Sequence, residues 1–447
     1  MQDDRRNKVI IMGAAGRDFH NFNVVFRNDP LTRVVAFTAA QIPDIAGRTY
    51  PPVLSGPLYP NGIPIVAESE LLSLIKRDRL NWVYFSYSDV SHQDVMHTAS
   101  TVLAAGANFA FLAPESTAIA PSKPVISVCA VRTGVGKSSA TCRIARFFLE
   151  RRRQVSVIRH PMPYGDLEAQ RVQRFGEMND LERLEATIEE REEYEPLLQM
   201  DITVFAGVDY HAILHRAEVD ADLIIWDGGN NDLPFVRPDL HVSLVDPHRP
   251  GDETSYHPGE ANLRMADLVI INKVDSATPG QLAQVQAGVE SVAKANVPVI
   301  LADSVLTVAD PDQVKGKRIL VVGDGPTLTH GGMAYGAGTI AARQLGAAEI
   351  VSGRQFAVGS ISDAYDTYPH MESEVPALGY SPEQLADLEA TLNATEAELV
   401  LFATPVDLDQ LVSVNKPLVA VAYELEERGG ELAEILGDFD YYKLSGG

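Results

Sequence analysis

The stretch VISVCAVRTGVGKSS, residues 125–139, constrains this chain more than any other. A short apolar run ends in a glycine-bearing turn, and the turn closes on Gly136, Lys137, Ser138 and Ser139 before a helical pattern begins. This is the layout of a nucleotide-phosphate loop, in which backbone N–H groups and a lysine surround the phosphates. The helix that follows would direct its positive N-terminal end at the same phosphates. The stretch therefore predicts a β-α unit that binds a nucleotide.

The loop departs from the usual consensus at one position, because Val131 stands five residues before Gly136, where a glycine is expected. Arg132 lies five residues before Lys137. Deviant P-loop ATPases carry a second lysine at this spacing, and RTGVGKS resembles that variant with arginine in its place. Since a guanidinium pairs bidentately with phosphate oxygens, we predict that Arg132 is a second phosphate clamp, within one chain or across a dimer. The predicted nucleotide-binding residues of the loop are Thr133, Gly134, Val135, Gly136, Lys137, Ser138 and Ser139.

Composition narrows the class of protein. The chain has 447 residues, of which 45% are hydrophobic, and a net charge of −24. The length predicts two or three domains. No apolar run approaches the roughly 20 residues of a membrane span, and the polar start MQDDRRNKV predicts no secretory signal, so we expect a cytoplasmic protein. The negative charge disfavours nucleic acid and anionic membranes as partners.

Short apolar strands alternate with helical stretches along the whole chain, which indicates an α/β fold with parallel sheets. We predict a P-loop NTPase domain over residues 121–310, flanked by an N-terminal Rossmann-like domain over 1–120 and a C-terminal α/β domain over 311–447. A Pro- and Ser-rich stretch, 113–124, is the expected linker.

The first segment carries GAAGRD after its first strand, without the middle glycine of a dinucleotide fingerprint. No acidic residue closes the second strand, so a dinucleotide is not expected. Arg17, with His20 nearby, could instead bind a smaller phosphate. A plain turn is the alternative.

Asp227 closes the apolar run 223–226 and is followed by two glycines. A carboxylate at the end of a strand beside the P-loop strand is the acid on the Mg²⁺ side of P-loop NTPases. We therefore predict that Ser138 and Asp227 hold Mg²⁺ and that Asp227 belongs to the catalytic set.

Asn272, Lys273 and Asp275 form an NKVD sequence after the apolar run 268–271. It resembles the base-recognition motif of GTPases, where the aspartate accepts hydrogen bonds from guanine. Relatives of this P-loop class use an Asn-Lys pair here with ATP, so ATP and GTP both remain open. A polar turn is the alternative.

Basic side chains follow two further strands: Arg159 and His160 after one, His248 and Arg249 after the other. Ligands of open α/β sheets bind beyond the carboxyl ends of the strands. These four residues are therefore predicted to face the same cleft as Lys137 and to bind a second, phosphorylated substrate, with ordinary loop hydrogen bonding as the alternative. His330, in a glycine-rich loop after another strand, is a further candidate for an anion site; a flexible loop is equally compatible.

Taken together, these segments resemble one family, archaeal cyclic 2,3-diphosphoglycerate synthetase and its bacterial relatives. The motifs that carry the resemblance are GAAGRDFHNFN (13–23), SYSDVSH (86–92), VRTGVGKSS (131–139), RHPMPYGD (159–166), TIEEREEYEP (187–196), FAGVDY (205–210), WDGGNND (226–232), DPHRPGDE (246–253), YHPGEANLRMADLVIINKVD (256–275) and DGPTLTHGG (324–332).

The resemblance implies an ATP- and Mg²⁺-dependent synthetase that joins the two phosphates of 2,3-diphosphoglycerate and releases ADP and phosphate. It further implies that Glu189 and its acidic neighbours on 187–196 serve the metal or order a lid, whereas charge alone favours a solvated helix face. Arg17, His20 and His330 are the expected substrate-binding residues. A homodimer is expected for this class of P-loop. A regulatory or assembly GTPase, built on the same P-loop and NKVD sequence, is the alternative function.

Overall fold

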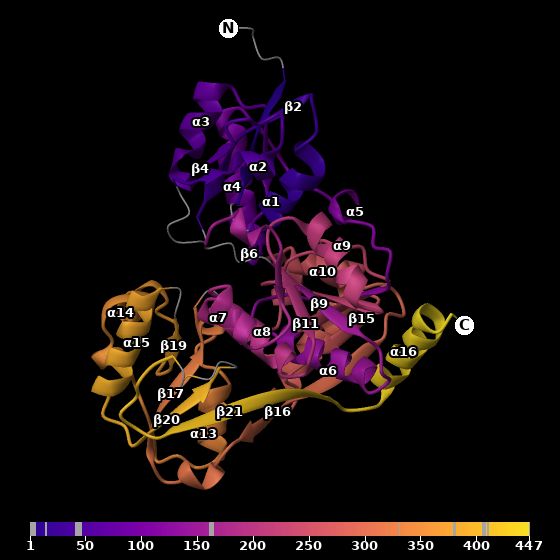
Figure 1. Ribbon diagram of the computed structural model, residues 1–447. Helices are drawn as coiled ribbons and strands as arrows, with labels where there is room; N and C mark the ends of the chain where they lie inside the picture. The colour runs from indigo at the N-terminus through magenta and orange to yellow at the C-terminus, as the bar shows by residue number, and fades with distance from the viewer. Residues whose placement is uncertain are drawn as a thin grey trace.

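The computed structural model describes residues 6–13, 16–40, 47–160, 165–329, 331–378, 381–404, 408 and 411–446. Its N-terminal part, at the top of Figure 1, contains a six-stranded sheet. The strand order is β3-β4-β2-β1-β5-β7, parallel except for β3. The strands are β1 (Asn7–Met12), β2 (Thr32–Ala39), β3 (Thr49–Tyr50), β4 (Ile63–Ala67), β5 (Trp82–Phe85) and β7 (Asn108–Ala110). Its helices are α1 (Arg17–Asn21), α2 (Pro52–Ser55), α3 (Leu71–Asp78), α4 (His92–Ala105) and α5 (Pro114–Thr117).

The central part contains the P-loop strand β8 (Val125–Ala130) in a sheet of order β10-β11-β9-β12-β8-β13-β15-β16, parallel except for β10. Strands β8, β12, β13 and β15 are buried along their whole length because helices cover both faces, which explains their continuous apolar sequences. The other strands are β9 (Val155–Arg159), β10 (Gln173–Phe175), β11 (Thr203–Ala206), β12 (Leu223–Asp227), β13 (Leu240–Val245), β15 (Leu268–Ile271) and β16 (Val299–Val308). The helices are α6 (Lys137–Leu149), α7 (Asn179–Arg183), α8 (Ile188–Leu198), α9 (Tyr210–Asp220), α10 (Gly259–Met265) and α11 (Pro279–Val292).

The C-terminal part continues the same sheet through β16, which pairs in parallel with β15 and then antiparallel with β21 (Leu418–Glu427). Beyond β21 the order is β20-β17-β18, with β19 beside β17. These strands are β17 (Arg318–Asp324), β18 (Glu349–Val351), β19 (Val375–Ala377) and β20 (Leu399–Ala403), and the helices are α12 (Gly325–Leu328), α13 (Ala337–Gln344), α14 (Gly359–Thr367) and α15 (Pro382–Ala394). The α/β fold predicted from the sequence is confirmed.

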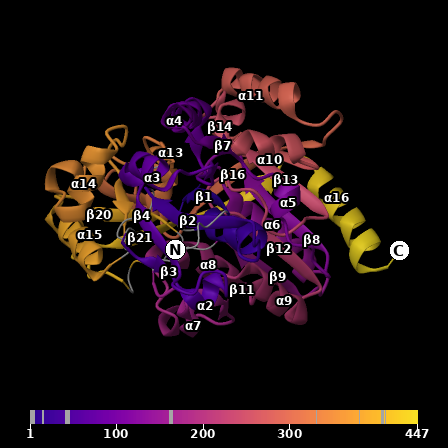
Figure 2. The same cartoon turned by 90° about the horizontal axis from the view of Figure 1, so that it is seen from above.

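The last segment of the chain does not stay with the expected 311–447 unit. From β21 it returns to the central part, where Leu432, Leu436 and Phe439 of α16 (Glu431–Phe439) join the same hydrophobic core as Phe148 of α6. Figure 2 shows α16 on one side of the central part and α14 and α15 on the other. Residues 425–446 are therefore corrected to the P-loop unit, because their apolar side chains are buried there.

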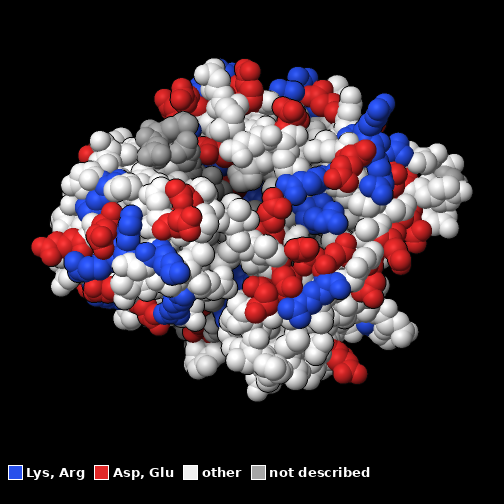
Figure 3. Space-filling view, turned by 90° about the horizontal axis from the view of Figure 1, so that it is seen from below, with Lys and Arg blue, Asp and Glu red and all other residues white. Residues whose placement is uncertain are grey.

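The N-terminal sheet is joined to the central part by a small antiparallel pair, β6 (Val90–Ser91) with β14 (Tyr256–His257). No helix among the described residues is long and apolar enough to cross a membrane. On the face in Figure 3, acidic and basic side chains lie interspersed. Residues of all three parts lie together at the carboxyl ends of the central strands, where they line one cavity.

Candidate functional site

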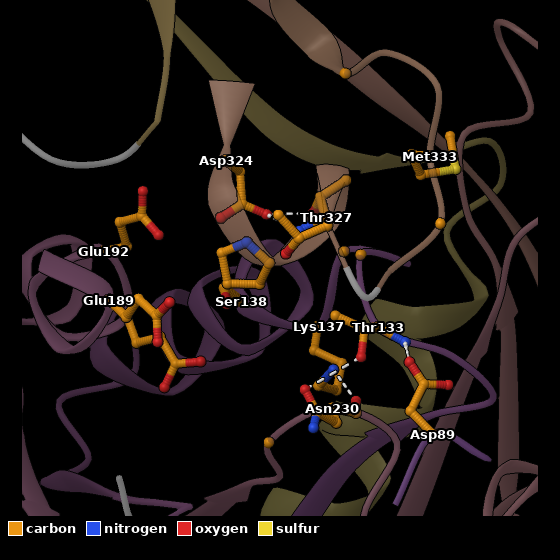
Figure 4. A pocket seen from close by; sticks show the side chains of 18 of the residues that line it. Asp89, Thr133, Lys137, Ser138, Glu189, Glu192, Asn230, Asp324, Thr327 and Met333 are labelled. Carbon is orange, nitrogen blue, oxygen red and sulfur yellow. Dashed lines mark hydrogen bonds between the residues drawn. The ribbon is translucent and has the colours of Figure 1, made fainter. Parts of the chain in front are cut away.

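A cavity of about 920 Å³ lies beyond the carboxyl ends of the central strands and is lined by all three parts of the chain. The N-terminal part contributes Arg17 and Asp89, the central part contributes the P-loop and α8, and the C-terminal part contributes Asp324 and Thr327. Figure 4 shows Asp89, Lys137, Glu189, Glu192, Asp324 and Thr327 around this cavity. Its size falls in the range of sites that hold a nucleotide or a drug-sized ligand. The predicted position of the site, at the strand ends, follows the general rule for open α/β sheets.

The P-loop closes tightly around the start of α6. Gly136 caps the helix with φ 108°, and a Cβ there would lie 2.3 Å from Asn272 Nδ2, so only glycine fits. Lys137 Nζ donates to the Asn230 carbonyl oxygen, and burial lowers the pKa of this ammonium group. Of the predicted loop residues, Thr133, Gly134, Gly136, Lys137, Ser138 and Ser139 line the cavity, whereas the Val135 side chain is buried beneath it.

Two NKVD residues hold the P-loop through its backbone carbonyl groups. Asn272 Nδ2 donates to the Val135 carbonyl (2.8 Å), and Lys273 Nζ donates to the Gly134 carbonyl (2.6 Å). Asp275 accepts from the Ser304 backbone N–H at 2.8 Å. Asn272, Lys273 and Asp275 all border the cavity. Two of them therefore hold the loop in shape, and recognition of a base by Asp275 stays a prediction.

Asp227 closes β12 as predicted, but it is paired inside the protein. Arg159, which is 1% exposed, forms an ion pair with Asp227, and its Nε donates to Glu193 Oε2 at 3.0 Å. Burial raises the pKa of Asp227, opposed by the charge of Arg159. For Arg159, burial lowers the pKa, but the charges of Asp227 and Glu193 outweigh it and keep the guanidinium charged.

The residues at this corner fit a magnesium ion. Asp227 offers a carboxylate that Arg159 already pairs with, and Ser138, whose hydroxyl lies at the first turn of α6, lines the cavity. In the described part of the chain, no group of three His, Cys, Asp or Glu side chains is arranged to hold a metal. One serine hydroxyl and one carboxylate are a donor set that suits Mg²⁺, which takes one or two protein oxygens and fills its shell with phosphate oxygens and water.

The cations predicted to bind a substrate anion line the cavity, but each contacts a protein acceptor. Arg17 Nε donates to Asp232 Oδ1 at 3.0 Å, and His160 Nδ1 lies 3.2 Å from Asp232 Oδ2. Arg249 donates to the carbonyls of Thr133 and Gly331, both at 2.8 Å, and to Asp246. His248 Nε2 lies 2.9 Å from the Ser276 hydroxyl.

Among the described residues, three predicted site residues besides Val135 do not line the cavity: Asp227, Arg132 and His20. Arg132 donates to Asp89 Oδ1 at 2.6 Å, pairs with Asp252 and lies 3.6 Å from the centre of the Tyr256 ring. Two carboxylates and an aromatic face thus hold the guanidinium in this geometry, and its role as a phosphate clamp stays a prediction.

His20 is a core residue. It is 1% exposed and stacks on Phe235 at 4.1 Å, and its Nε2 lies 2.8 Å from the Thr117 carbonyl. Burial lowers its pKa to about 3. The prediction that His20 binds substrate is therefore wrong. His330 lies outside the described residues, as does the segment 161–164 that follows His160.

Helix α8 forms an acidic wall of the cavity rather than a solvated face. A capping box between Thr187 and Glu190 starts the helix, and Glu189 and Glu192 are both 5% exposed and line the cavity with Asp324. Burial raises the pKa of Glu192 well above its usual value, and the nearby Asp324 charge raises it further. The interpretation of 187–196 as a solvated helix is wrong, because α8 packs against β11 and α6 and its glutamates at 189, 190, 192 and 195 are buried.

Several residues that build the site were not singled out from the sequence. Each of them lies in one of the motifs that carry the family resemblance, and membership of a motif is the sequence signal that could have identified it. These residues are Asp89 in SYSDVSH, Asn230 and Asp232 in WDGGNND, Glu193 in TIEEREEYEP, Asp246 in DPHRPGDE and Asp324 in DGPTLTHGG.

Comparison with known proteins gives one relative across the whole chain. Arginine synthetase ArcE of Thermococcus kodakarensis is 54% identical over 440 residues, which cover 98% of each chain. No family model matches. Among solved structures, LpxK from Aquifex aeolicus in complex with ATP has a TM-score of 0.45 and 16% identity, covering 77% of this chain and 94% of that one. A ParA family ATPase from Chlorobium tepidum has a TM-score of 0.23 and 15% identity, covering 40% and 84%.

Proposed function

The chain belongs to the family of the arginine synthetase ArcE of Thermococcus kodakarensis, and from this premise we propose that it is an ATP-dependent enzyme that forms arginine. The identity of 54% extends over 98% of both chains, so the match includes the N-terminal, central and C-terminal parts of this chain. The name of this relative supports a reaction in which ATP drives formation of a guanidino group.

The chemistry of such a synthesis requires phosphoryl transfer before nitrogen enters. A ureido oxygen is a poor leaving group, so the oxygen first attacks the γ-phosphorus of ATP, and ADP leaves. The product is a phosphorylated isourea, in which phosphate is a good leaving group. An amine nitrogen then attacks the central carbon, the carbon–oxygen bond breaks, and inorganic phosphate departs. Both steps need positioning and charge neutralisation more than covalent catalysis.

The residues of the cavity suit these two steps. The Lys137 ammonium and the backbone of 133–138 would bind the outer phosphates of ATP. Ser138 and Asp227 would hold Mg²⁺, which neutralises phosphate charge when it is bound. Glu193 keeps Arg159 beside Asp227, so the acid on the metal side stays in place before the nucleotide arrives.

The single observation that carries the proposal beyond the family name is the acidic wall opposite the P-loop. Glu189, Glu192 and Asp324 line the same cavity as Lys137 (Figure 4). Carboxyl groups favour a ligand with an amino or guanidino group and disfavour one with several phosphates. An amino acid with a cationic product therefore fits this wall better than a bisphosphate.

A second candidate is the cyclisation of 2,3-diphosphoglycerate, which the sequence motifs favour. It needs free cations around the substrate, whereas Arg17 and Arg249 each contact a carboxylate of the chain. A regulatory GTPase, suggested by the NKVD sequence, would need base recognition by Asp275 and no second substrate.

Phosphorus NMR and mass spectrometry test these candidates together. The protein is incubated with ATP or GTP and with one of three additions: a ureido amino acid plus ammonium chloride, 2,3-diphosphoglycerate, or none. We expect one arginine, one ADP and one phosphate per turnover in the first case. A cyclic diphosphate would support the second candidate, and slow GTP hydrolysis without substrate dependence would support the GTPase; either result without arginine would overturn the proposal.

A further inference from the structure

We propose that Arg249 is a positioning residue that couples the nucleotide site to the acidic wall, so that a nucleotide on the P-loop fixes the place of the amino acid. The inference deepens the proposed function and rests on it for the ligand of the wall. One guanidinium group, 11% exposed, is bonded to loops of two different parts of the chain. Its Nη2 donates to the Thr133 carbonyl and its Nη1 donates to the Gly331 carbonyl, both at 2.8 Å.

The carbonyl groups of the P-loop are held from one anchor, Asp246, which follows β13. Its Oδ2 accepts from Arg249 Nη2 at 3.2 Å and from Lys273 Nζ at 3.0 Å. Arg249 holds the Thr133 carbonyl, and Lys273 holds that of Gly134. Because the N–H groups of a P-loop face the phosphates, these contacts leave its phosphate side open. Two cations thus brace neighbouring peptide groups, and in the described part of the chain the arginine alone of the two also donates to the C-terminal part.

The C-terminal loop that Arg249 holds is tied to the acidic wall. The Gly331 N–H donates to the Pro326 carbonyl at 2.9 Å, in the first turn of α12. The next residue, Thr327, donates to Asp324 Oδ2 through its N–H, at 3.2 Å, and through its hydroxyl. One compact turn therefore sets the position of the Gly331 carbonyl and of the Asp324 carboxylate.

A second contact joins the same two loops. Gly134 has φ 75°, and a Cβ at this residue would lie 3.0 Å from Thr327 Oγ1. Figure 4 shows Asp324 and Thr327 in contact within the cavity that Lys137 lines. The turn thus packs on the P-loop backbone next to the peptide group that Arg249 holds, and the arginine adds directional hydrogen bonds to this packing.

A guanidinium group suits this role, because its planar fork holds two acceptors at a fixed separation. Phosphates that bind the N–H groups of the P-loop fix its backbone, and the fork transmits that order to Gly331. The consequence for the reaction is geometric: the ureido oxygen must lie in line with the γ-phosphorus, and a misplacement of about 1 Å costs about 100-fold in rate. In this role Arg249 acts through the backbone rather than on the reacting atoms.

Hydrogen–deuterium exchange tests the coupling without the amino acid. The full chain is followed by mass spectrometry with and without a saturating non-hydrolysable ATP analogue and Mg²⁺. In the unaltered protein we expect the analogue to slow exchange in peptides that contain α12 about 10-fold, an ordinary size for coupling between two sites. The slowing should disappear in Arg249→Met and persist in Lys273→Met, because the first variant alone loses the bond to Gly331.

Arginine formation gives the second readout. With ATP, a ureido amino acid and ammonium chloride all saturating, Arg249→Met should lower kcat about 100-fold. Arg249→Lys should recover part of this loss, since an ammonium group can bond to one of the two carbonyls. Arg249→Met and Lys273→Met should raise the KM for ATP to a similar degree, because each removes one brace of the P-loop. Asp246 keeps one cation in either variant, so both should fold, which the midpoint of thermal unfolding checks.

The outcomes separate this inference from the function on which it rests. If the unaltered protein forms no arginine, the proposed function is wrong, while the exchange experiment still decides whether Arg249 couples the P-loop to α12. If the analogue slows exchange at α12 equally in the unaltered protein and in Arg249→Met, or in neither, the coupling does not run through the arginine and the inference is wrong. If Arg249→Met raises only the KM for ATP, as Lys273→Met does, Arg249 is a second brace of the P-loop, which equally overturns the inference.

Discussion

Two groups of buried carboxyl groups around this cavity behave in opposite ways. Burial alone would raise the pKa of Asp232 and Asp246, but neighbouring cations, Arg17 for the first and Lys273 for the second, lower both values to about 2. On α8, burial raises the pKa of Glu190 to about 7 and that of Glu192 well above its usual value. Carboxyl groups of similar burial are thus charged or protonated according to what they contact.

This difference separates carboxylates that hold the fold together from carboxyl groups that are available to a ligand. Carboxylates that contact a cation of the chain anchor loops at the strand ends. The α8 wall instead places Glu192 beside Asp324, where a cationic ligand would favour the charged form of Glu192. The predictions below test the two groups separately.

The largest expected effect is on stability, from Arg159→Met. This change leaves Asp227, which is 1% exposed, without its cation, and removing one partner of a buried pair costs about 3–5 kcal/mol. Denaturant unfolding should show a loss of this size. Combining it with Asp227→Asn should recover much of the loss, because the buried charge is then gone. A loss below about 1 kcal/mol for the single variant would mean that the pair does not anchor the site.

Lys137→Ala should mainly affect catalysis. Removing a preorganised cation from a phosphoryl-transfer site lowers kcat by about 100- to 1000-fold. A loss of this size in the steady-state rate of ADP release, together with an unchanged midpoint of thermal unfolding, would identify the effect as catalytic. Lys273→Met is the matched comparison: its ammonium group braces the Gly134 carbonyl, so it should raise KM for the nucleotide more than it lowers kcat. Equal effects of both lysine variants on kcat would contradict the division of roles.

The raised pKa of Glu190 predicts a pH dependence of stability. Since its pKa is about 7 in the folded chain and 4.5 in the reference state, the folded chain binds the proton more tightly. The stabilisation that this proton binding adds to the unfolding free energy is complete below pH 4.5 and is lost as pH rises to about 7. The change is on the order of 3 kcal/mol. Glu190→Gln keeps the capping box and should remove this slope. Unfolding free energies of the two proteins across this range measure the difference; parallel curves would contradict it.

The sequence predicted the P-loop side of the site well, because its geometry is local. Gly136, Lys137 and Ser138 are adjacent, and the positions of Asp227 and Lys273 follow from strand ends alone. The partners of the basic residues could not be predicted in this way. Arg17 and Asp232 are 215 positions apart, and Arg132 and Asp252 are 120 apart, so only the folded chain brings them together. Counting cations at strand ends therefore overstated how many are available to a substrate anion.

Helix α8 and the end of the chain show a second limit of sequence patterns. The charged stretch 187–196 lacks an apolar stripe and suggests solvent exposure, yet α8 packs against β11 and α6, and its Glu189 and Glu192 line the cavity. Residues 425–446 follow the C-terminal strands in sequence, but their apolar side chains complete the core of the P-loop unit. In both cases tertiary packing, which no local pattern contains, decides the outcome.

The smallest expected effect comes from an arginine pair of the same type as Arg159 with its carboxylates, but placed in solvent. Arg146 of α6 lies 3.3 Å from Glu424 of β21, and the two side chains are 45% and 65% exposed. Water screens such a pair, so Arg146→Ala should change the unfolding free energy by less than about 1 kcal/mol, and that small change should shrink further in high salt. Denaturant unfolding at two salt concentrations, run beside Arg159→Met, measures both. If the two variants lost similar stability, burial would not be what distinguishes the pairs, and the assignment of Arg159 as the anchor of Asp227 would lose its physical basis.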